Sequence, residues 1–177
     1  MQNQQTFHGS FLPKEFFVVS GHATSSVSPL NAFDKALAKA GIAQCNIVNV
    51  SSILPPDAVE RDNVQITPGT ITFTVMAKMD GNPGETIGAG VGWAWGIGND
   101  GKRYGIVAEA HGYKDKEAIE KELKWKLEEM AKIRGLTIES IKTKCEFIEV
   151  PKGKYGSVVV ALVYAPWTEK ESLRNLT

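Results

Sequence analysis

Residues 46–56 read Asn-Ile-Val-Asn-Val-Ser-Ser-Ile-Leu-Pro-Pro. The β-branched residues Ile47, Val48 and Val50 predict a short strand. The two prolines that close the segment exclude a helix or a regular ladder there, and they restrict the residue before them to extended geometry. Ser51 and Ser52 therefore lie at the end of a strand, where the surrounding chain can hold a backbone in a strained conformation.

The serine pair makes self-cleavage possible. A serine hydroxyl that is held against the preceding carbonyl can attack it, so that the amide becomes an ester, the ester eliminates, and the dehydroalanine hydrolyses to a pyruvoyl group. At Ser52 this reaction would divide the chain into residues 1–51 and 52–177 and would create an electrophile. The alternative is an ordinary strand end with two solvated hydroxyls, because short motifs alone rarely identify chemistry.

Length and composition predict one globular domain. The chain has 177 residues, of which 42% are hydrophobic and 23% charged, and its formal net charge is zero, so nothing favours a nucleic-acid or membrane partner. No apolar run approaches the roughly 20 residues of a spanning helix, and the amino terminus lacks a signal-peptide pattern, so we expect a cytoplasmic protein. No cysteine or histidine has a partner at ligand spacing, and we expect no metal site.

The first third of the chain predicts a short buried strand at 16–19, a polar loop at 21–28 and a helix. Ser28 suits the N-cap of this helix, Pro29 its first position and Gly41 its end. Its apolar positions, which we expect to face a core, are Leu30, Phe33, Ala36, Leu37 and Ala40.

Further strands are predicted at 70–79, 85–98, 103–110, 139–150 and 156–164, with a long helix at 114–134. The buried stripe of this helix is expected to be Ile119, Leu123, Leu127, Met130 and Ile133. Residues 85–98 are unusual because glycine in a strand interior costs stability. One face would carry Gly88, Gly90, Gly92, Ala94 and Gly96, and the other Ala89, Val91, Trp93 and Trp95. The spacing excludes a glycine-rich phosphate loop, so we expect close packing against another backbone or sheet, with the tryptophans in the core or at a subunit contact.

Two carboxylates have alternative interpretations. Glu109 ends an apolar strand, and it either faces water at an edge or is held in a dry pocket, where burial would keep it protonated. Asp34 is either a solvated aspartate that the helix dipole favours or a group that binds a ligand.

Five motifs resemble the pyruvoyl-dependent arginine decarboxylase family and cover roughly residues 15–165 in order. They are Pro-Leu-Asn-Ala-Phe-Asp at 29–34, Asn-x-x-x-x-Ser-Ser-Ile-x-Pro-Pro at 46–56, Pro-Gly-Glu-Thr-Ile at 83–87, Gly-Ile-Val-Ala-Glu at 105–109 and Glu-Met-Ala-Lys-Ile at 129–133. The resemblance implies an α+β fold, a four-layer α/β/β/α sandwich whose facing sheets pack through small residues.

The resemblance also implies roles for single residues. Ser52 would become a covalently bound pyruvoyl group and Ser51 the new carboxyl terminus. Asn46 would polarise or position the scissile carbonyl, for which a bend or bulge must intervene in the strand. Glu109 would be the proton donor, and Asp34 would accept the substrate guanidinium in two parallel hydrogen bonds.

The activity so implied is that of a carboxy-lyase of polyamine biosynthesis, which converts L-arginine to agmatine and carbon dioxide through a Schiff base. It would need no pyridoxal phosphate or metal and would act as a trimer of cleaved protomers. Residues 21–27 are less acidic than the family pattern, and Ala110-His111-Gly112 replaces an aromatic and an acid. Ornithine, lysine or another amino acid therefore remains open as substrate, as does a non-catalytic, uncleaved oligomeric protein.

Overall fold

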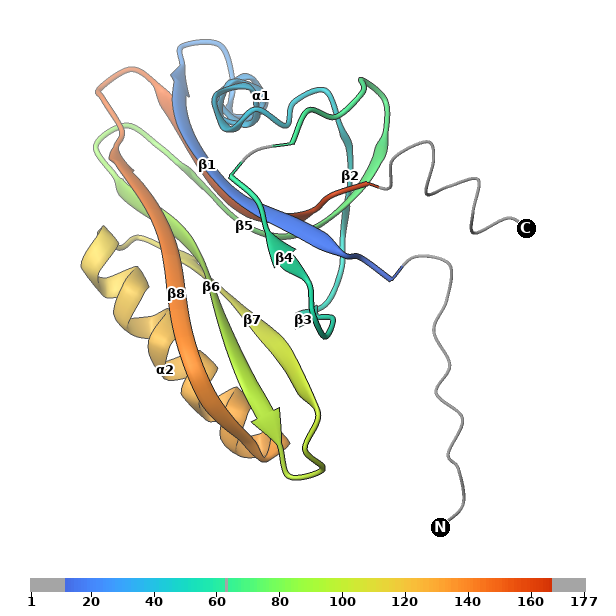
Figure 1. Ribbon diagram of the computed structural model, residues 1–177. Helices are drawn as coiled ribbons and strands as arrows, with labels where there is room; N and C mark the ends of the chain where they lie inside the picture. The colour runs from blue at the N-terminus through green and yellow to red at the C-terminus, as the bar shows by residue number, and fades with distance from the viewer. Residues whose placement is uncertain (1–11, 63, 167–177) are drawn as a thin grey trace.

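The computed structural model describes residues 12–62 and 64–166 as two sheets with one helix on each (Figure 1). The helices are α1 (Pro29–Ala40) and α2 (Lys116–Arg134). The strands are β1 (Glu15–Ser25), β2 (Asn46–Asn49), β3 (Ile53–Leu54), β4 (Val59–Glu60), β5 (Ile71–Gly81), β6 (Thr86–Gly98), β7 (Arg103–Gly112), β8 (Leu136–Glu149) and β9 (Tyr155–Tyr164). The five-stranded sheet has the order β2-β5-β9-β1-β4 and the four-stranded sheet the order β3-β7-β6-β8.

The elements form four layers. Helix α1 packs on β1 and β9, and α2 packs on β6, β7 and β8, so each helix covers the outer face of one sheet (Figure 1). The inner faces of the two sheets pack together around the largest core cluster, which includes Phe16, Val75, Val91, Trp93, Val107 and Leu162. The predicted α/β/β/α sandwich is confirmed.

Helix α1 begins and ends at the predicted residues. The Ser28 hydroxyl accepts from the Asn31 amide at 3.2 Å, and Gly41 adopts the left-handed conformation at the end, with φ of 77°. The apolar prediction was partly wrong: Ala36 and Ala40 are buried, but Leu30 is 72% exposed. Leu30 therefore contributes surface and not core in the single chain.

Strand β1 continues to Ser25, so the segment 21–28 that was predicted to be a loop is strand up to that residue and a loop only at 26–28. It pairs with β9 in an unbroken antiparallel register from Phe16 opposite Tyr164 to Ser25 opposite Tyr155. Helix α1 crosses this strand so closely that a Cβ atom on Gly21 would lie 2.3 Å from the Ala36 carbonyl oxygen. Gly21 is small because of this helix contact, and not because it lies in a loop.

The glycine face of β6 was predicted to pack closely against another backbone or sheet. Another backbone does approach Gly88, where a Cβ atom would lie 2.5 Å from the Lys114 carbonyl oxygen, but the facing sheet does not pack here. This face lies under α2, and a Cβ atom on Gly90 would approach Ile119 Cγ2 to 2.6 Å. The other side of β6, which carries Val91 and Trp93, packs against the five-stranded sheet. There the Trp93 and Phe16 rings are in edge-to-face contact, with their centroids 6.5 Å apart. Of the two alternatives for Trp93, core packing holds.

Helix α2 begins after the N-cap Asp115 and ends at Gly135, close to the predicted bounds. Ile119, Leu123 and Leu127 are buried, as predicted. Ile133 was predicted to belong to the same stripe, but it is 84% exposed, and Trp125 is 60% exposed. Neither helix in the described part of the chain has the length and apolar character needed to cross a membrane.

Alanine at Gly88 is expected to destabilise the fold by about 1–3 kcal/mol, because the new Cβ would lie 2.5 Å from the Lys114 carbonyl oxygen, a backbone atom that cannot move aside cheaply. Gly92→Ala is the matched control, since its nearest contact, at 3.0 Å, is the flexible end of Leu127. We expect Gly92→Ala to be nearly neutral, because alanine also reduces the entropy of the unfolded chain. Urea unfolding measures both, and equal losses would contradict this assignment.

Candidate active site

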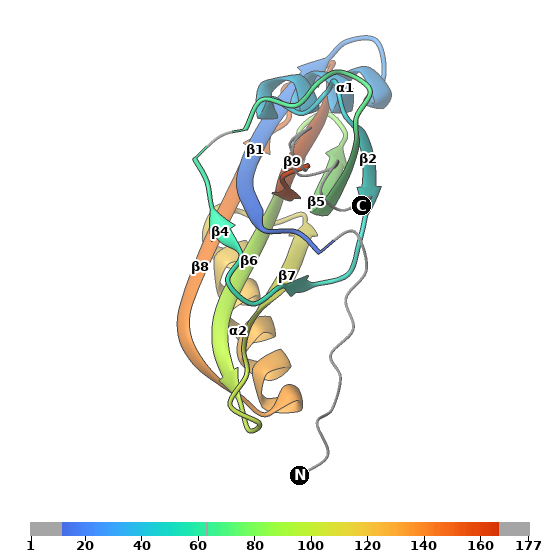
Figure 2. The ribbon, with the colours of Figure 1, turned by 45° about the vertical axis from the view of Figure 1, so that its right-hand side comes forward.

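The two serines lie where the chain passes from one sheet to the other. Strand β2 pairs in parallel with β5 from Asn46 to Asn49, and the Val50 amide extends this ladder to Thr74 O at 2.9 Å. Strand β3 pairs with β7 in the other sheet. Figure 2 shows the chain running down from β2 into β3 beside β7. Because consecutive strands here belong to different layers, the chain must turn at the serines.

The turn is centred on Ser52. The Ile53 amide donates to the Ser51 carbonyl at 3.2 Å, which closes a three-residue γ-turn. Among the described residues Asp57 is the one non-glycine residue with positive φ, so Ser52 adopts the inverse form of this turn. The Ser52 carbonyl in turn accepts from the Val107 amide at 2.9 Å, so the backbone is held on both sides of the residue.

Tyr164 reaches this turn from the opposite sheet. Its hydroxyl donates to the Ile53 carbonyl at 2.6 Å, and the residue is 5% exposed. Burial raises the pKa of Tyr164 to about 12, so the phenol is a neutral donor at ordinary pH. The sequence prediction missed this residue, although a buried tyrosine needs a partner for its hydroxyl and that need was a usable indication.

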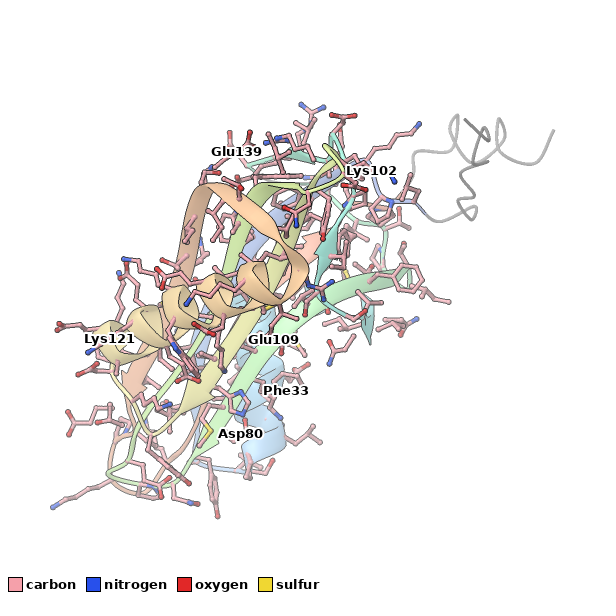
Figure 3. All side chains as sticks on the ribbon, turned by 90° about the horizontal axis from the view of Figure 1, so that it is seen from below. Phe33, Asp80, Lys102, Glu109, Lys121 and Glu139 are labelled. Carbon is pink, nitrogen blue, oxygen red and sulfur yellow. The ribbon has the colours of Figure 1, made fainter. Side chains whose placement is uncertain are left out.

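Ser52 and Glu109 line the same pocket, which has a volume of about 330 Å³. Strand β3 pairs with β7 only at Gly105 and Ile106, and Glu109 follows on the part of β7 that β3 leaves open. Figure 3 shows Glu109 beside α2, which supplies the opposite wall. That wall consists mainly of Trp125, Lys126, Glu129, Met130 and Ile133. The fold thus brings together the predicted pyruvoyl position and the predicted proton donor, 57 residues apart in sequence.

Glu109 is half-buried, and its burial raises the pKa of the carboxyl. Electrostatic interactions with His111 and Lys126 oppose that rise in pKa. Lys126 Nζ donates to the main-chain carbonyl of Glu109 at 2.8 Å and pairs with Glu122 at 2.7 Å. Lys114 contacts the other carboxylate oxygen of Glu122 at 2.5 Å. Of the two interpretations of Glu109, its half-buried position at the wall of the pocket favours the partly dry one.

Asn46 lies at the far end of β2 from the serines. The side-chain amide nitrogen of Asn46 donates to the Gly69 carbonyl at 2.8 Å. The pairing of β2 with β5 is regular up to Asn49. The predicted bend or bulge is therefore absent from β2, and the chain turns only at Ser52. An extended strand from Asn46 to Ser52 spans roughly 20 Å. The role of Asn46 in cleavage stays a prediction, and within one chain its side chain is committed to Gly69.

Asp34 is exposed on α1 and is not among the residues that line the pocket. Its role as a guanidinium ligand stays a prediction that requires a second chain to bring it there. The described residues contain no group of three or more histidine, cysteine, aspartate or glutamate side chains placed to hold a metal ion.

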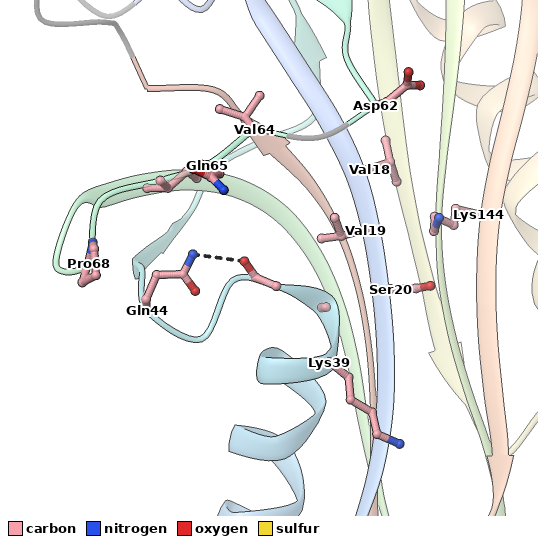
Figure 4. A pocket seen from close by; sticks show the side chains of 13 residues that line it. Val18, Val19, Ser20, Lys39, Gln44, Asp62, Val64, Gln65, Pro68 and Lys144 are labelled. Carbon is pink, nitrogen blue, oxygen red and sulfur yellow. Dashed lines mark hydrogen bonds between the residues drawn. The ribbon is translucent and has the colours of Figure 1, made fainter.

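A larger hollow, of about 680 Å³, contains none of the predicted site residues. It lies between the end of α1 and β1, where Gln44 donates to the Gly41 carbonyl at 3.1 Å and Lys39 and Lys144 stand at the wall (Figure 4). Its polar lining and its distance from the serines in the fold separate it from the Ser52 pocket, which we take as the candidate active site.

The comparisons with known proteins agree with the resemblance read from the motifs. The family model described as pyruvoyl-dependent arginine decarboxylase matches residues 15–169. A pyruvoyl-dependent arginine decarboxylase of Methanopyrus kandleri is 35% identical over 154 residues, which cover 86% of this chain and 97% of the relative. Proteins of the same name from Pyrococcus furiosus and Thermoplasma volcanium are 34% and 32% identical, over 88% and 89% of this chain and 97% and 92% of their own.

Proposed function

The chain belongs to the pyruvoyl-dependent arginine decarboxylase family, and we propose that it cleaves itself between Ser51 and Ser52 and converts L-arginine to agmatine and carbon dioxide. The observation that supports this most is the shared pocket, because Ser52 and Glu109 line one cavity. Decarboxylation needs the electrophile proposed at Ser52 and the proton donor proposed at Glu109 to lie close to the same substrate carbon. The protein would work as two chains, residues 1–51 and 52–177, that remain folded as one unit. A cytoplasmic location stays a prediction.

Self-cleavage would begin with attack of Ser52 Oγ on the Ser51 carbonyl carbon. The hydroxyl proton passes to the departing amide nitrogen, the carbon–nitrogen bond breaks and an ester forms. Loss of the Ser52 α-proton then breaks the ester bond, which releases Ser51 as a carboxylate and leaves dehydroalanine, and water displaces the nitrogen as ammonia. The γ-turn supports the first step, because the Ile53 amide at 3.2 Å polarises the carbonyl that is attacked.

The residues around Ser52 fit a pyruvoyl group at that position. Its amide carbonyl would keep the hydrogen bond from the Val107 amide, and Ser52 is already half-buried at the wall of an open pocket. When present, the group supplies a carbonyl electrophile for the substrate amine and a sink for the electron pair left by the departing carbon dioxide. This is the work of pyridoxal phosphate done by a group made from the chain.

Glu109 would deliver the proton to the substrate α-carbon after the carboxylate has left. Burial raises its pKa and so favours the protonated form that a donor requires. After donation the carboxyl is negative, and the ammonium of Lys126, already fixed on the Glu109 carbonyl, stabilises that charge without having to move. The apolar side chains of Trp125, Met130 and Ile133 form the same wall, and they would limit water there once a neighbouring copy covers them.

The choice of arginine rests on the names of the relatives and on Asp34, whose carboxylate matches a planar guanidinium. The segment Ala110-His111-Gly112 follows Glu109 where the family pattern has an aromatic residue and an acid, so the charge around the pocket differs from that pattern. Ornithine and lysine are the alternative substrates, and an uncleaved, non-catalytic protein is the alternative of another class.

A trimer would explain the surface of the pocket. Trp125 and Ile133 are 60% and 84% exposed at its wall, and Leu30 is 72% exposed on α1 near Asp34. Large apolar side chains exposed in this way are typical of a face that another protein surface covers. We propose that a neighbouring copy covers them and brings its Asp34 toward the pocket. Light scattering should then give three times the 19.3 kDa of one chain, and a monomer would contradict the assembly.

Two measurements on the purified wild-type protein test the proposed function. Intact mass under denaturing conditions should show two chains split between Ser51 and Ser52, the larger with a blocked amino terminus of pyruvoyl mass. Release of carbon dioxide should then be fastest with arginine in a panel that includes ornithine and lysine. A chain that stays whole would overturn the enzyme proposal, and a cut chain that prefers ornithine or lysine would overturn only the substrate.

A further inference from the structure

The backbone groups of Ile53 have an unusual set of partners. In the antiparallel pairing of β3 with β7, the Ser52 carbonyl accepts from Val107, so Ile53 stands opposite Ile106 in a non-hydrogen-bonded pair. Both the amide and the carbonyl of Ile53 therefore point away from β7, at the edge of the sheet. A residue in this position normally leaves those two groups to solvent or to a neighbouring strand.

Neither group of Ile53 is left to solvent here. Its amide donates to the Ser51 carbonyl at 3.2 Å, and its carbonyl accepts the Tyr164 hydroxyl at 2.6 Å. Tyr164 lies in β9 of the opposite sheet and is 5% exposed, so its ring is fixed by the core between the sheets. The bond joins a rigid part of one sheet to the residue that follows the cleavage site in the other.

We propose that Tyr164 is a positioning residue for self-cleavage, because its hydroxyl holds Ile53 in the orientation that keeps the Ile53 amide on the Ser51 carbonyl. The inference rests on the proposed function and extends it to the way in which the precursor is held ready. Tyr164 acts through Ile53 and touches neither the attacking hydroxyl nor the carbonyl that is attacked. It serves the cleavage of the chain and not the later decarboxylation.

The physical reason lies in the edge position of β3. This strand has two residues and pairs with only one neighbour, so its own ladder holds Ile53 weakly. Without the phenolic hydroxyl, Ile53 can rotate so that its carbonyl reaches water, and the γ-turn then opens. An open turn removes the hydrogen bond that polarises the Ser51 carbonyl and relaxes the geometry needed for attack.

Tyr164→Phe removes the hydroxyl and keeps the ring, and we expect it to slow self-cleavage tenfold or more. The matched control is Ser157→Ala, which also removes a buried hydroxyl from β9, one that donates to Asp80 at 2.8 Å far from the serines. Both variants are expected to fold and to lose a few degrees in Tm, but only Tyr164→Phe should cleave slowly. The rate is followed by intact mass from the time of synthesis.

Hydroxylamine separates the first step from the later ones, because it cuts an ester but not an amide. If Tyr164 acts before attack, hydroxylamine should cut the wild-type precursor quickly and Tyr164→Phe slowly. Equal cutting of the two, or equal slowing in Ser157→Ala, would overturn the inference. A wild-type chain that stays uncut would overturn the proposed function and this inference with it, whereas a cut wild type and an equally fast Tyr164→Phe would overturn the inference alone.

Discussion

Replacing Ser52 with alanine is expected to leave one uncut chain of 177 residues and to reduce decarboxylation to the background of an empty assay. Alanine has no hydroxyl to attack the Ser51 carbonyl, so neither the ester nor the electrophile made from it can form. The fold should survive, since the turn is closed by the Ser51 carbonyl and the Ile53 amide, and the Ser52 side chain takes no part in that hydrogen bond. Intact mass and an arginine assay measure the two losses on the same sample.

Ser51→Ala identifies which hydroxyl reacts. Only the carbonyl of Ser51 takes part in the proposed attack, so this chain is expected to be cut, with a new carboxyl terminus at alanine. The exposed Ser26→Ala controls for the loss of a serine hydroxyl far from the turn. Cutting of Ser52→Ala at the same bond would assign the nucleophile to another residue. If Ser51→Ala also stayed whole, that residue would be Ser51.

The local chemistry of the sequence predicted the helices well and the first strand poorly. Ser28, Pro29 and Gly41 bound α1 because capping depends on a few neighbouring residues. The end of β1 looked like a loop because its residues are small, yet Gly21 is small because the Ala36 carbonyl lies against it. Small residues indicate that another segment of the chain approaches closely, but the sequence does not identify which segment it is.

The same limit explains the glycines of β6 and the residues of the site. Gly90 was expected to meet another backbone or sheet, and instead it meets the side chain of Ile119 in α2. Ser52 and Glu109 could be named from their motifs, because those motifs are local. For Tyr164 the sequence indicated only that a buried hydroxyl needs a partner; the partner itself could not be named, because it lies 111 residues away and depends on how the two sheets face each other. Ile133 was expected to continue the helical stripe, but the buried stripe of α2 ends with Ala131, and Ile133 lies off it.

Glu109→Gln is expected to lower kcat by about 10²–10⁴-fold while self-cleavage runs to completion. Glutamine keeps the size of the side chain and removes the proton that the substrate α-carbon must receive. KM should change little, since the proposed role is proton transfer and not binding. Glu128→Gln, an exposed carboxylate on α2, is the control. An uncut Glu109→Gln chain would place Glu109 in maturation, and a kcat near that of the wild type would exclude it as the donor.

The pH dependence of kcat gives a second and independent test of Glu109. Burial raises its pKa, and a proton donor works only in its protonated form, so kcat should fall as the pH rises through that raised pKa. Lys126→Met removes a positive charge that lowers the pKa of Glu109. The fall in kcat should therefore move to higher pH in this variant, although kcat itself declines because the carboxylate left after donation is no longer stabilised.

Lys124→Met is the matched control for that shift. Lys124 pairs with Glu120 four residues earlier on α2, as Lys126 pairs with Glu122, but it is not among the residues that line the pocket. Loss of a helical ion pair alone costs only about 0.3–0.5 kcal/mol, so Lys124→Met should leave the pH profile in place. A shift in both variants, or a shift to lower pH in Lys126→Met, would mean that the fall in kcat reports the titration of a group other than Glu109. A shift in Lys126→Met alone would show that the pKa of Glu109 depends on the Lys126 ammonium, which is hydrogen-bonded to the main-chain carbonyl of Glu109.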